Sequence, residues 1–229
     1  MASSRTPLED GALPYWQINV PPSQREAECP SALRDLPVRD QTILSTPDSE
    51  YPILSWEEAQ ELVKANQINL FHRQPSQLRR YHFFSHHVRK KYGSLLNFIL
   101  SQKLEWTEPV TPAGNPFEKE EDIKIVYNDW PYGIDERIVH LVIWTKFPFE
   151  EDDITGDLTP PARAEVNEYV QRVFVKVCGD ENVIWFKNWA SLKSIRALEH
   201  FHVMLFNPDA AFLDKITNGD VPLSRSFNG

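Results

Sequence analysis

The sequence predicts an α+β domain in which helices flank an antiparallel β-sheet. Three observations support this fold class. Helical patterns come first, two strand-like segments joined by a short turn follow, and one long helical pattern then precedes two more strand-like segments. This order lacks the regular alternation of strands and helices that is typical of parallel sheets.

The first helices are expected between residues 55 and 99. Ser55 has the chemistry of an N-cap and Glu58 follows three residues later, so a capping box is expected to open a short helix. Pro75 stands where the first turn of a second helix tolerates it. Apolar residues of this second helix recur at spacings of three and four and form one buried stripe, namely Leu78, Tyr81, Phe84, Val88, Tyr92, Leu95 and Ile99. Gly93 is expected to kink or interrupt it.

Four segments rich in β-branched and aromatic residues are expected to be strands. They lie near residues 123–128, 138–146, 182–187 and 200–206. Pro131 and Gly133 supply turn chemistry between the first two. The clearest helix is expected over 160–178, with Thr159 as its cap and Gly179 as its end. The stretch ASLKSIRALE, before the last strand, predicts a helical or irregular connection.

Residues 1–50 differ from the rest of the chain, because they are rich in Pro and Ser and show little hydrophobic periodicity. This pattern predicts an arm that is extended or partly disordered and that lies over the domain through Tyr15 and Trp16. Residues 51–229 are expected to form a single α+β domain, and the length allows a sizeable hydrophobic core.

The composition excludes several classes of protein. No apolar run approaches the roughly 20 residues of a membrane span, so no membrane association is expected. The N-terminus lacks the basic and apolar regions of a secretory signal. The chain has two cysteines, far apart in sequence, which form neither a disulfide framework nor a metal quartet. A reducing compartment is therefore expected, the cytoplasm and also the nucleus.

The charge is distributed unevenly. The net charge of −9 argues against a nucleic-acid partner. Residues 62–104, however, contain no Asp or Glu and hold eight basic side chains, namely Lys64, Arg73, Arg79, Arg80, Arg89, Lys90, Lys91 and Lys103. One interpretation is a solvated basic surface, which charge runs usually are. The other is a local site for an anion such as phosphate, with Arg79 and Arg80 as ligand-binding groups.

The stretch EHFHVML places His200 and His202 on the same face of an expected strand. One interpretation is structural, with both imidazoles hydrogen-bonded to the backbone or to Glu199. A second is catalytic, because one imidazole can act as a nucleophile while its neighbour fixes the tautomer and charge. A third adds His140, so that three imidazoles would bind Zn²⁺ or Fe²⁺. The expected number of strands is too low for the barrel that such a metal site usually occupies.

Other polar residues complete a constellation with this pair. Asp129 stands in the turn NDWPYG, His140 begins the second expected strand, and Lys146 ends it. Asn188 follows the third expected strand, twelve residues before the first histidine of the pair. Asp129 is equally compatible with a purely turn-forming role. For Lys146, a solvated charge at a strand end is favoured over a catalytic role.

This order of residues, over about 123–206, resembles the histidine-triad superfamily, whose members bind nucleoside phosphates in a small antiparallel sheet flanked by helices. The resemblance implies that His202 attacks the α-phosphorus. It also implies that Asn188 donates a hydrogen bond to a phosphate oxygen and that Asp129 accepts from ribose hydroxyls. Trp130 and Tyr132 offer faces on which a base or sugar could stack, although aromatic residues near a turn more often cover the edge of a core.

The signature of that superfamily is three histidines at alternate positions of one strand, and it is incomplete here. His200 takes the first position and His202 the nucleophilic one, but Met204 replaces the third histidine. In an alternative register Leu198 is first, His200 is the nucleophile and His202 is the third member. Neither methionine nor leucine donates a strong hydrogen bond or carries charge, so the triad lacks one of its polar groups in either register.

A closer resemblance covers most of the chain from about Ser55. The stretches YNDWPYGIDERIVHLVIWTK and WFKNWASLKSIRALEHFHVML are similar to the fungal N-acetylglucosamine-induced protein family, whose domain is uncharacterised. The resemblance implies a link to the cellular response to N-acetylglucosamine.

Two functions are therefore expected of the sequence. The first is a histidine-triad-like hydrolase or transferase that acts on a nucleotide or nucleotide-sugar phosphate. The second is a regulatory protein that binds such a ligand and has lost catalysis. The sequence has no Gly-x-Ser-x-Gly, P-loop or Gly-x-Gly-x-x-Gly motif, and no cofactor or resident metal is expected.

Overall fold

The computed structural model describes residues 13–189, 195 and 197–227. The expectations for residues 1–12, and for most of the connection before the last strand, lie outside the described residues. Within the described chain, no helix is both long enough and apolar enough to cross a membrane.

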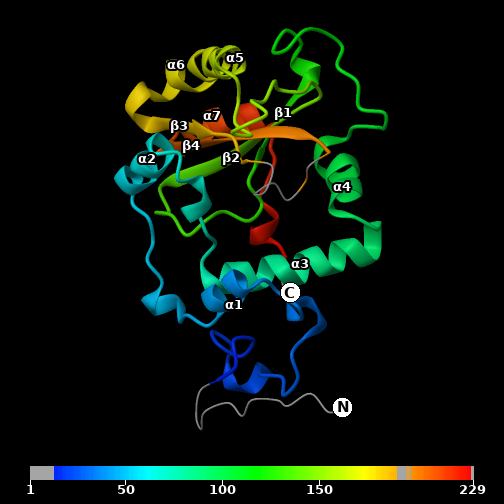
Figure 1. Ribbon diagram of the computed structural model, residues 1–229, viewed down its shortest axis with the longest axis vertical. Coiled ribbons are helices and arrows are strands. Elements are labelled where there is room, and N and C mark those ends of the chain that lie inside the picture. The colour runs from blue at the N-terminus through cyan, green and yellow to red at the C-terminus, as the bar shows by residue number, and fades with distance from the viewer. Residues whose placement is uncertain (1–12, 190–194, 196, 228–229) are drawn as a thin grey trace.

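A four-stranded antiparallel sheet forms the centre of the protein, which confirms the predicted α+β class (Figure 1). The strand order is β1-β2-β4-β3, and the strands are β1 (Ile123–Tyr127), β2 (Ile138–Thr145), β3 (Val183–Phe186) and β4 (Glu199–Phe206). All four predicted strands are present. In this order β2 and β4 form the middle of the sheet. Their register places Val142 of β2 opposite His202 of β4.

One face of the sheet is covered by the C-terminal half of the chain. Its helices are α5 (Pro160–Val170), α6 (Lys176–Cys178) and α7 (Ala210–Thr217). A π-helical turn at Gln171–Val175 joins α5 to α6, so the helix predicted over 160–178 is continuous. Leu141, Phe201 and Val203 point from the sheet into this core and are fully buried. Alternation then sends their neighbours in sequence to the other face.

The other face is covered by helices from the N-terminal half (Figure 1). They are α2 (Trp56–Lys64), α3 (Pro75–Tyr92) and α4 (Leu95–Phe98), and α1 (Val38–Leu44) packs against α3. The predicted capping box opens α2: Ser55 Oγ accepts from the Glu58 N–H, and the Glu58 carboxylate accepts from the Ser55 N–H. Gly93, with φ of +80°, ends α3 and separates it from α4, as predicted.

Residues 13–50 are more regular than an extended arm. Besides α1 they contain three short 3₁₀ turns, at Pro22–Gln24, Ser31–Leu33 and Asp48–Glu50. The Tyr15 hydroxyl donates to the Leu33 carbonyl oxygen, and the Arg79 guanidinium donates to the Trp16 carbonyl oxygen. Leu33 and other apolar side chains of this part are buried against α3, which holds the segment on the domain.

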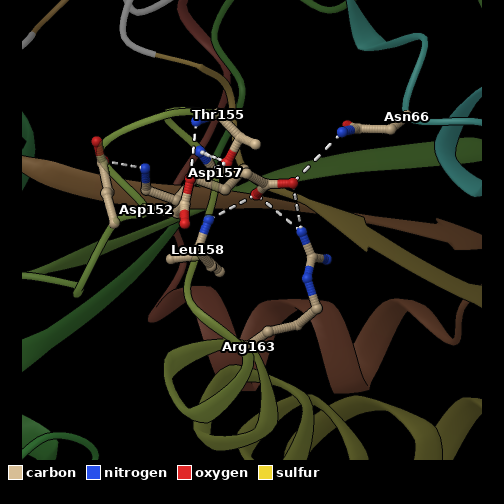
Figure 2. A network of polar contacts seen from close by, with 8 residues as sticks. Asn66, Asp152, Thr155, Asp157, Leu158 and Arg163 are labelled. Atoms are coloured by element: carbon tan, nitrogen blue, oxygen red, sulfur yellow. Dashed lines mark hydrogen bonds and ion pairs between the residues drawn. The ribbon is translucent and has the colours of Figure 1, made fainter.

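The acidic loop between β2 and α5 is held by hydrogen bonds within the loop and to neighbouring segments (Figure 2). Asp152 accepts hydrogen bonds from the backbone N–H groups of Ile154 and Thr155, at 3.0 and 2.8 Å. Asp157 accepts two 2.8 Å hydrogen bonds from Arg163 of α5 and one from Asn66. The Asp157 carboxylate therefore connects the loop to α5 and to the segment after α2.

Candidate functional site

A cavity of about 400 Å³ lies between the sheet and α3. The sheet side of its wall includes Val142, Trp144, His200 and His202, and the α3 side includes Tyr81 and several other residues. The volume falls in the range of sites for small molecules. The cavity is therefore large enough to bind a small molecule.

Three imidazoles meet at this face of the sheet. His200 and His202 alternate along β4, and His140 comes from β2, where it is paired in register with Met204. The third imidazole of the cluster is therefore supplied by the neighbouring strand, whereas Met204 is fully buried in a hydrophobic cluster with Trp56. Sequence spacing within one strand could not reveal this substitution.

Two of these rings form a hydrogen-bonded chain with two asparagines. Nε2 of His140 lies 3.0 Å from Nδ1 of His202. The Asn128 side chain reaches Nδ1 of His140 at 3.1 Å, and the Asn188 side chain reaches Nε2 of His202 at 3.0 Å. The second ring nitrogen of each histidine is therefore also engaged, and both rings are about 95% buried or more.

The direction of this chain follows from Asn128. Its Oδ1 accepts from the backbone N–H of Trp130, so its Nδ2 donates to Nδ1 of His140. His140 then carries its proton on Nε2 and donates it to Nδ1 of His202. His202 in turn carries its proton on Nε2, and Asn188 must turn its oxygen toward it, because two donors would otherwise face each other. No lone pair of the His202 ring remains unused in this arrangement.

Both rings are neutral at physiological pH. Burial lowers the pKa of His140 to about 3, and the positive charge of Arg73 lowers it further. Burial also lowers the pKa of His202 well below its ordinary value, helped by His140, His200 and Arg73. Positive charge in the cavity must therefore come from other side chains.

Arg73 is a half-buried cation that is available for a ligand. Its Nε donates to the Trp130 carbonyl oxygen at 3.0 Å, and its guanidinium lies 4.1 Å from the centre of the Tyr81 ring and 5.9 Å from that of Tyr132. Within the described residues it forms no ion pair, and its two terminal nitrogens make no hydrogen bond. Arg73 lines the cavity, so these nitrogens are suited to bind an anion.

Two groups of charges in the cavity lining are neutralised by pairing, whereas Arg89 of α3 also lines the cavity as an exposed side chain. Lys103 contacts Asp129 at 2.9 Å and Asp220 at 2.7 Å. Burial raises the pKa of Asp129, although Lys103 opposes this effect. Asp40 accepts from His82 and Arg39, both at 3.1 Å; burial alone would raise its pKa, but these hydrogen bonds outweigh burial and lower it.

The predicted site residues divide into two groups. Six of them line the cavity: Asp129, Trp130, Tyr132, Asn188, His200 and His202. Asp129 lines it with its carboxylate already engaged, because Oδ1 accepts from Lys103 and from the Leu223 N–H. His140 is not part of the lining and supports His202 from behind.

Besides His140, three predicted ligand-binding residues lie outside the lining. Lys146 pairs with the buried Asp122 at 3.6 Å, because β2 carries it beyond the cavity. Arg79 binds the N-terminal segment. Arg80 donates to the carbonyl oxygens of Ser224 and Phe227 in the C-terminal segment. Arg79 and Arg80 of α3 therefore bind the two terminal segments and not the cavity.

Sequence reasoning missed Arg73 and Asn128 as individual site residues. Arg73 belongs to the acid-free segment that indicated an anion, but nothing in the sequence separates it from the other basic residues there. Asn128 directly precedes Asp129, and its role depends on an opposite strand. The described residues contain no group of three or more His, Cys, Asp or Glu side chains arranged to hold a metal ion. The three imidazoles instead bind amides, the backbone and one another.

Comparison with known proteins gives the family. A family model described as protein of unknown function (DUF3605) matches residues 55–206. The chain belongs to this family. The matched residues contain Arg73, Asn128, His140, Asn188 and His202. Asp40, which pairs with His82, and Asp220, which pairs with Lys103, lie outside them.

Two relatives and one crystal structure extend this result. N-acetylglucosamine-induced protein 1 of Candida albicans is 29% identical over 72% of this chain and 73% of its own length. An uncharacterised protein of Saccharomyces cerevisiae is 27% identical over 73% of this chain and 86% of its own length. The crystal structure of a protein called HTC1 is 25% identical, with a TM-score of 0.59, and the match covers 72% of this chain and 96% of that chain.

Proposed function

We propose that this protein binds a small phosphorylated ligand in the cavity, with the phosphate at Arg73. The unpaired guanidinium of Arg73 is the observation that carries the proposal. A buried or half-buried cation without a carboxylate partner is costly unless an anion completes it. Nucleotides and nucleotide sugars are the first candidates, because they combine a phosphate with rings that Tyr132 could contact.

A histidine-triad-like hydrolase or transferase is the second candidate. It is favoured by His202, whose neutral imidazole lies on the cavity wall. The hydrogen bonds of both His202 nitrogens favour binding over catalysis, because an attacking nitrogen needs a free lone pair. The name of the Candida relative motivates a further hypothesis, that the ligand belongs to the response to N-acetylglucosamine.

Calorimetric titration of the wild type tests the binding proposal. The ligands are inorganic phosphate, UMP, UDP-N-acetylglucosamine and N-acetylglucosamine 6-phosphate. Arg73→Gln should weaken binding of every ligand about 10- to 100-fold, the effect of removing a charge-assisted hydrogen bond. Arg137→Gln is the matched control, because Arg137 is an exposed arginine that pairs with Asp135. Equal affinities of wild type and Arg73→Gln would reject the assignment of Arg73.

Chromatographic detection of the products formed from UMP, UDP-N-acetylglucosamine and N-acetylglucosamine 6-phosphate separates the two candidates. Turnover by the wild type that is lost in His202→Asn would establish the enzyme and assign the nucleophile. Binding without turnover, unchanged in His202→Asn, would establish the binding protein.

A further inference from the structure

The wall of the cavity changes character from one end to the other. Around Arg73, the lining includes Tyr132, Asn188 and His202, all of which carry polar atoms. Toward α4, the wall consists of apolar side chains, which we call the apolar lobe: Leu95, Phe98, Ile99, Val126, Val142, Trp144 and Ile195. All of these except Phe98 belong to one hydrophobic cluster.

The sheet register explains why the two ends differ. His202 of β4 is opposite Val142 of β2, and Val142 is opposite Val126 of β1. The lining therefore changes from an imidazole on β4 to valines on β2 and β1, over a distance of about 10 Å across the sheet. Leu95 and Ile99 pack over the two valines from α4 and the turn that follows it.

The apolar lobe does not suit a polar organic group. A ribose or a second phosphate needs hydrogen-bond donors and charge wherever it is buried. The nearby charges Lys103 and Asp129 pair at 2.9 Å, and Asp220 also binds Lys103, so this group has no net positive charge. Arg89 also lines the cavity, but its side chain is exposed to solvent. A carbon chain or ring, by contrast, gains free energy from burial against this wall.

Two further polar groups of the cavity lining have no hydrogen-bond partner in the part of the chain that the structure describes. They are the buried Ser85 hydroxyl and the buried indole N–H of Trp130, and both residues line the cavity. Buried polar atoms are nearly always hydrogen-bonded in proteins. Trp130 contacts Tyr81, which lies below Arg73, and also belongs to a cluster that includes Leu95, so it stands between the two ends. These two atoms could donate to an oxygen that joins a headgroup to an apolar part.

We propose that the preferred ligand is an amphipathic anion, in which one anionic headgroup at Arg73 is linked through an oxygen atom to an apolar chain or ring in the apolar lobe. A phosphate ester of a hydrophobic alcohol has this chemistry. The inference rests on the proposed function, because the headgroup is the phosphate bound by Arg73, and it narrows the organic part of the ligand.

Calorimetric titration with a homologous series of probes tests this inference. The probes are ethyl, butyl, hexyl and octyl phosphate, used below their micellar concentrations, with inorganic phosphate and UMP as references. Each added methylene that enters the apolar lobe should raise the affinity about fourfold, the factor that corresponds to burial of one CH₂ group. Alkyl carboxylates of the same lengths show whether the headgroup must be a phosphate or can be another anion.

Three variants locate the parts of the ligand. Arg73→Gln should weaken all alkyl phosphates by a similar factor and leave the dependence on chain length unchanged. Val142→Thr, which adds a hydroxyl at nearly constant volume, should flatten that dependence. Ser85→Ala should weaken the alkyl phosphates several-fold, whereas a hydroxyl with only a structural role would leave their affinity unchanged. Thermal unfolding of each variant verifies that the fold is retained.

The outcomes separate this inference from the proposed function. Binding of inorganic phosphate and UMP without any gain from longer chains would overturn the apolar lobe as a ligand site and leave the phosphate site standing. No binding of any probe would overturn both. A gain with chain length that persists in Val142→Thr, with the same slope, would place the chain elsewhere and overturn the assignment of the lobe.

Discussion

Acidification should destabilise this protein between pH 7.5 and pH 5, because His140 and His202 are buried as neutral rings. The folded-state pKa of His140 is lowered to about 3, while the unfolded chain has an ordinary value near 6.5. Below pH 6.5 the unfolded state therefore binds a proton that the folded state does not. Stability is complete above this pH and falls as the pH decreases toward the folded-state pKa.

The magnitude follows from that difference. At pH 5, about 1.5 units below the unfolded value, His140 alone should cost about 2 kcal/mol of the free energy of unfolding relative to pH 7.5. His202 adds a loss of the same sign, since its pKa is also lowered. The pKa of Asp40 is lowered as well, so its contribution is lost only at more acidic pH, below this window.

Urea unfolding at a series of pH values measures this effect. His140→Gln should be less stable than the wild type at pH 7.5, since it disrupts the contact with His202, but should lose about 2 kcal/mol less on going to pH 5. His87→Gln is the control, because His87 is exposed and its replacement should leave the dependence on pH unchanged. A dependence in His140→Gln as steep as in the wild type would refute the buried neutral ring.

Three further predictions concern stability. Lys103→Met should lower the free energy of unfolding in urea by about 3–5 kcal/mol, because it leaves the carboxylates of Asp129 and Asp220 buried without their cation; a loss below about 1 kcal/mol would mean that these groups are solvated. Ser55→Ala should cost about 1 kcal/mol through loss of the capping box, measured by thermal unfolding, and no change would contradict the cap. Leu141→Ala should cost about 2–5 kcal/mol in urea and leave ligand affinity unchanged, because Leu141 is buried on the face opposite the cavity; altered affinity would contradict this separation of the two faces.

The terminal segments complete the site that the family region contains. Asp220 bridges Lys103 and the backbone N–H of Tyr127, at the end of β1. Its neighbours Leu223 and Ser224 donate backbone hydrogen bonds to Asp129. The C-terminal segment, shown in red in Figure 1, thus fixes the loop that carries Trp130 and Tyr132.

The sequence by itself determined the secondary structure and its order. Enrichment in β-branched and aromatic residues at 123–128, 138–146, 182–187 and 200–206 was sufficient for all four strands, because these side chains favour extended backbone locally. Ser55 and Gly93 marked helix boundaries for a similarly local reason, since caps and left-handed residues satisfy the backbone of their own helix end. Alternation also placed His200 and His202 on one face.

The tertiary structure decided which polar residues share the cavity. Arg73, Arg79 and Arg80 belong to one basic segment, yet only Arg73 lines the cavity, because the apolar stripe of α3 turns Arg79 and Arg80 toward the terminal segments. His140 completes the imidazole cluster because β2 pairs with β4. That pairing joins residues 62 positions apart in sequence. Long-range strand pairing and the burial of terminal segments depend on the whole fold, and no local pattern encodes them.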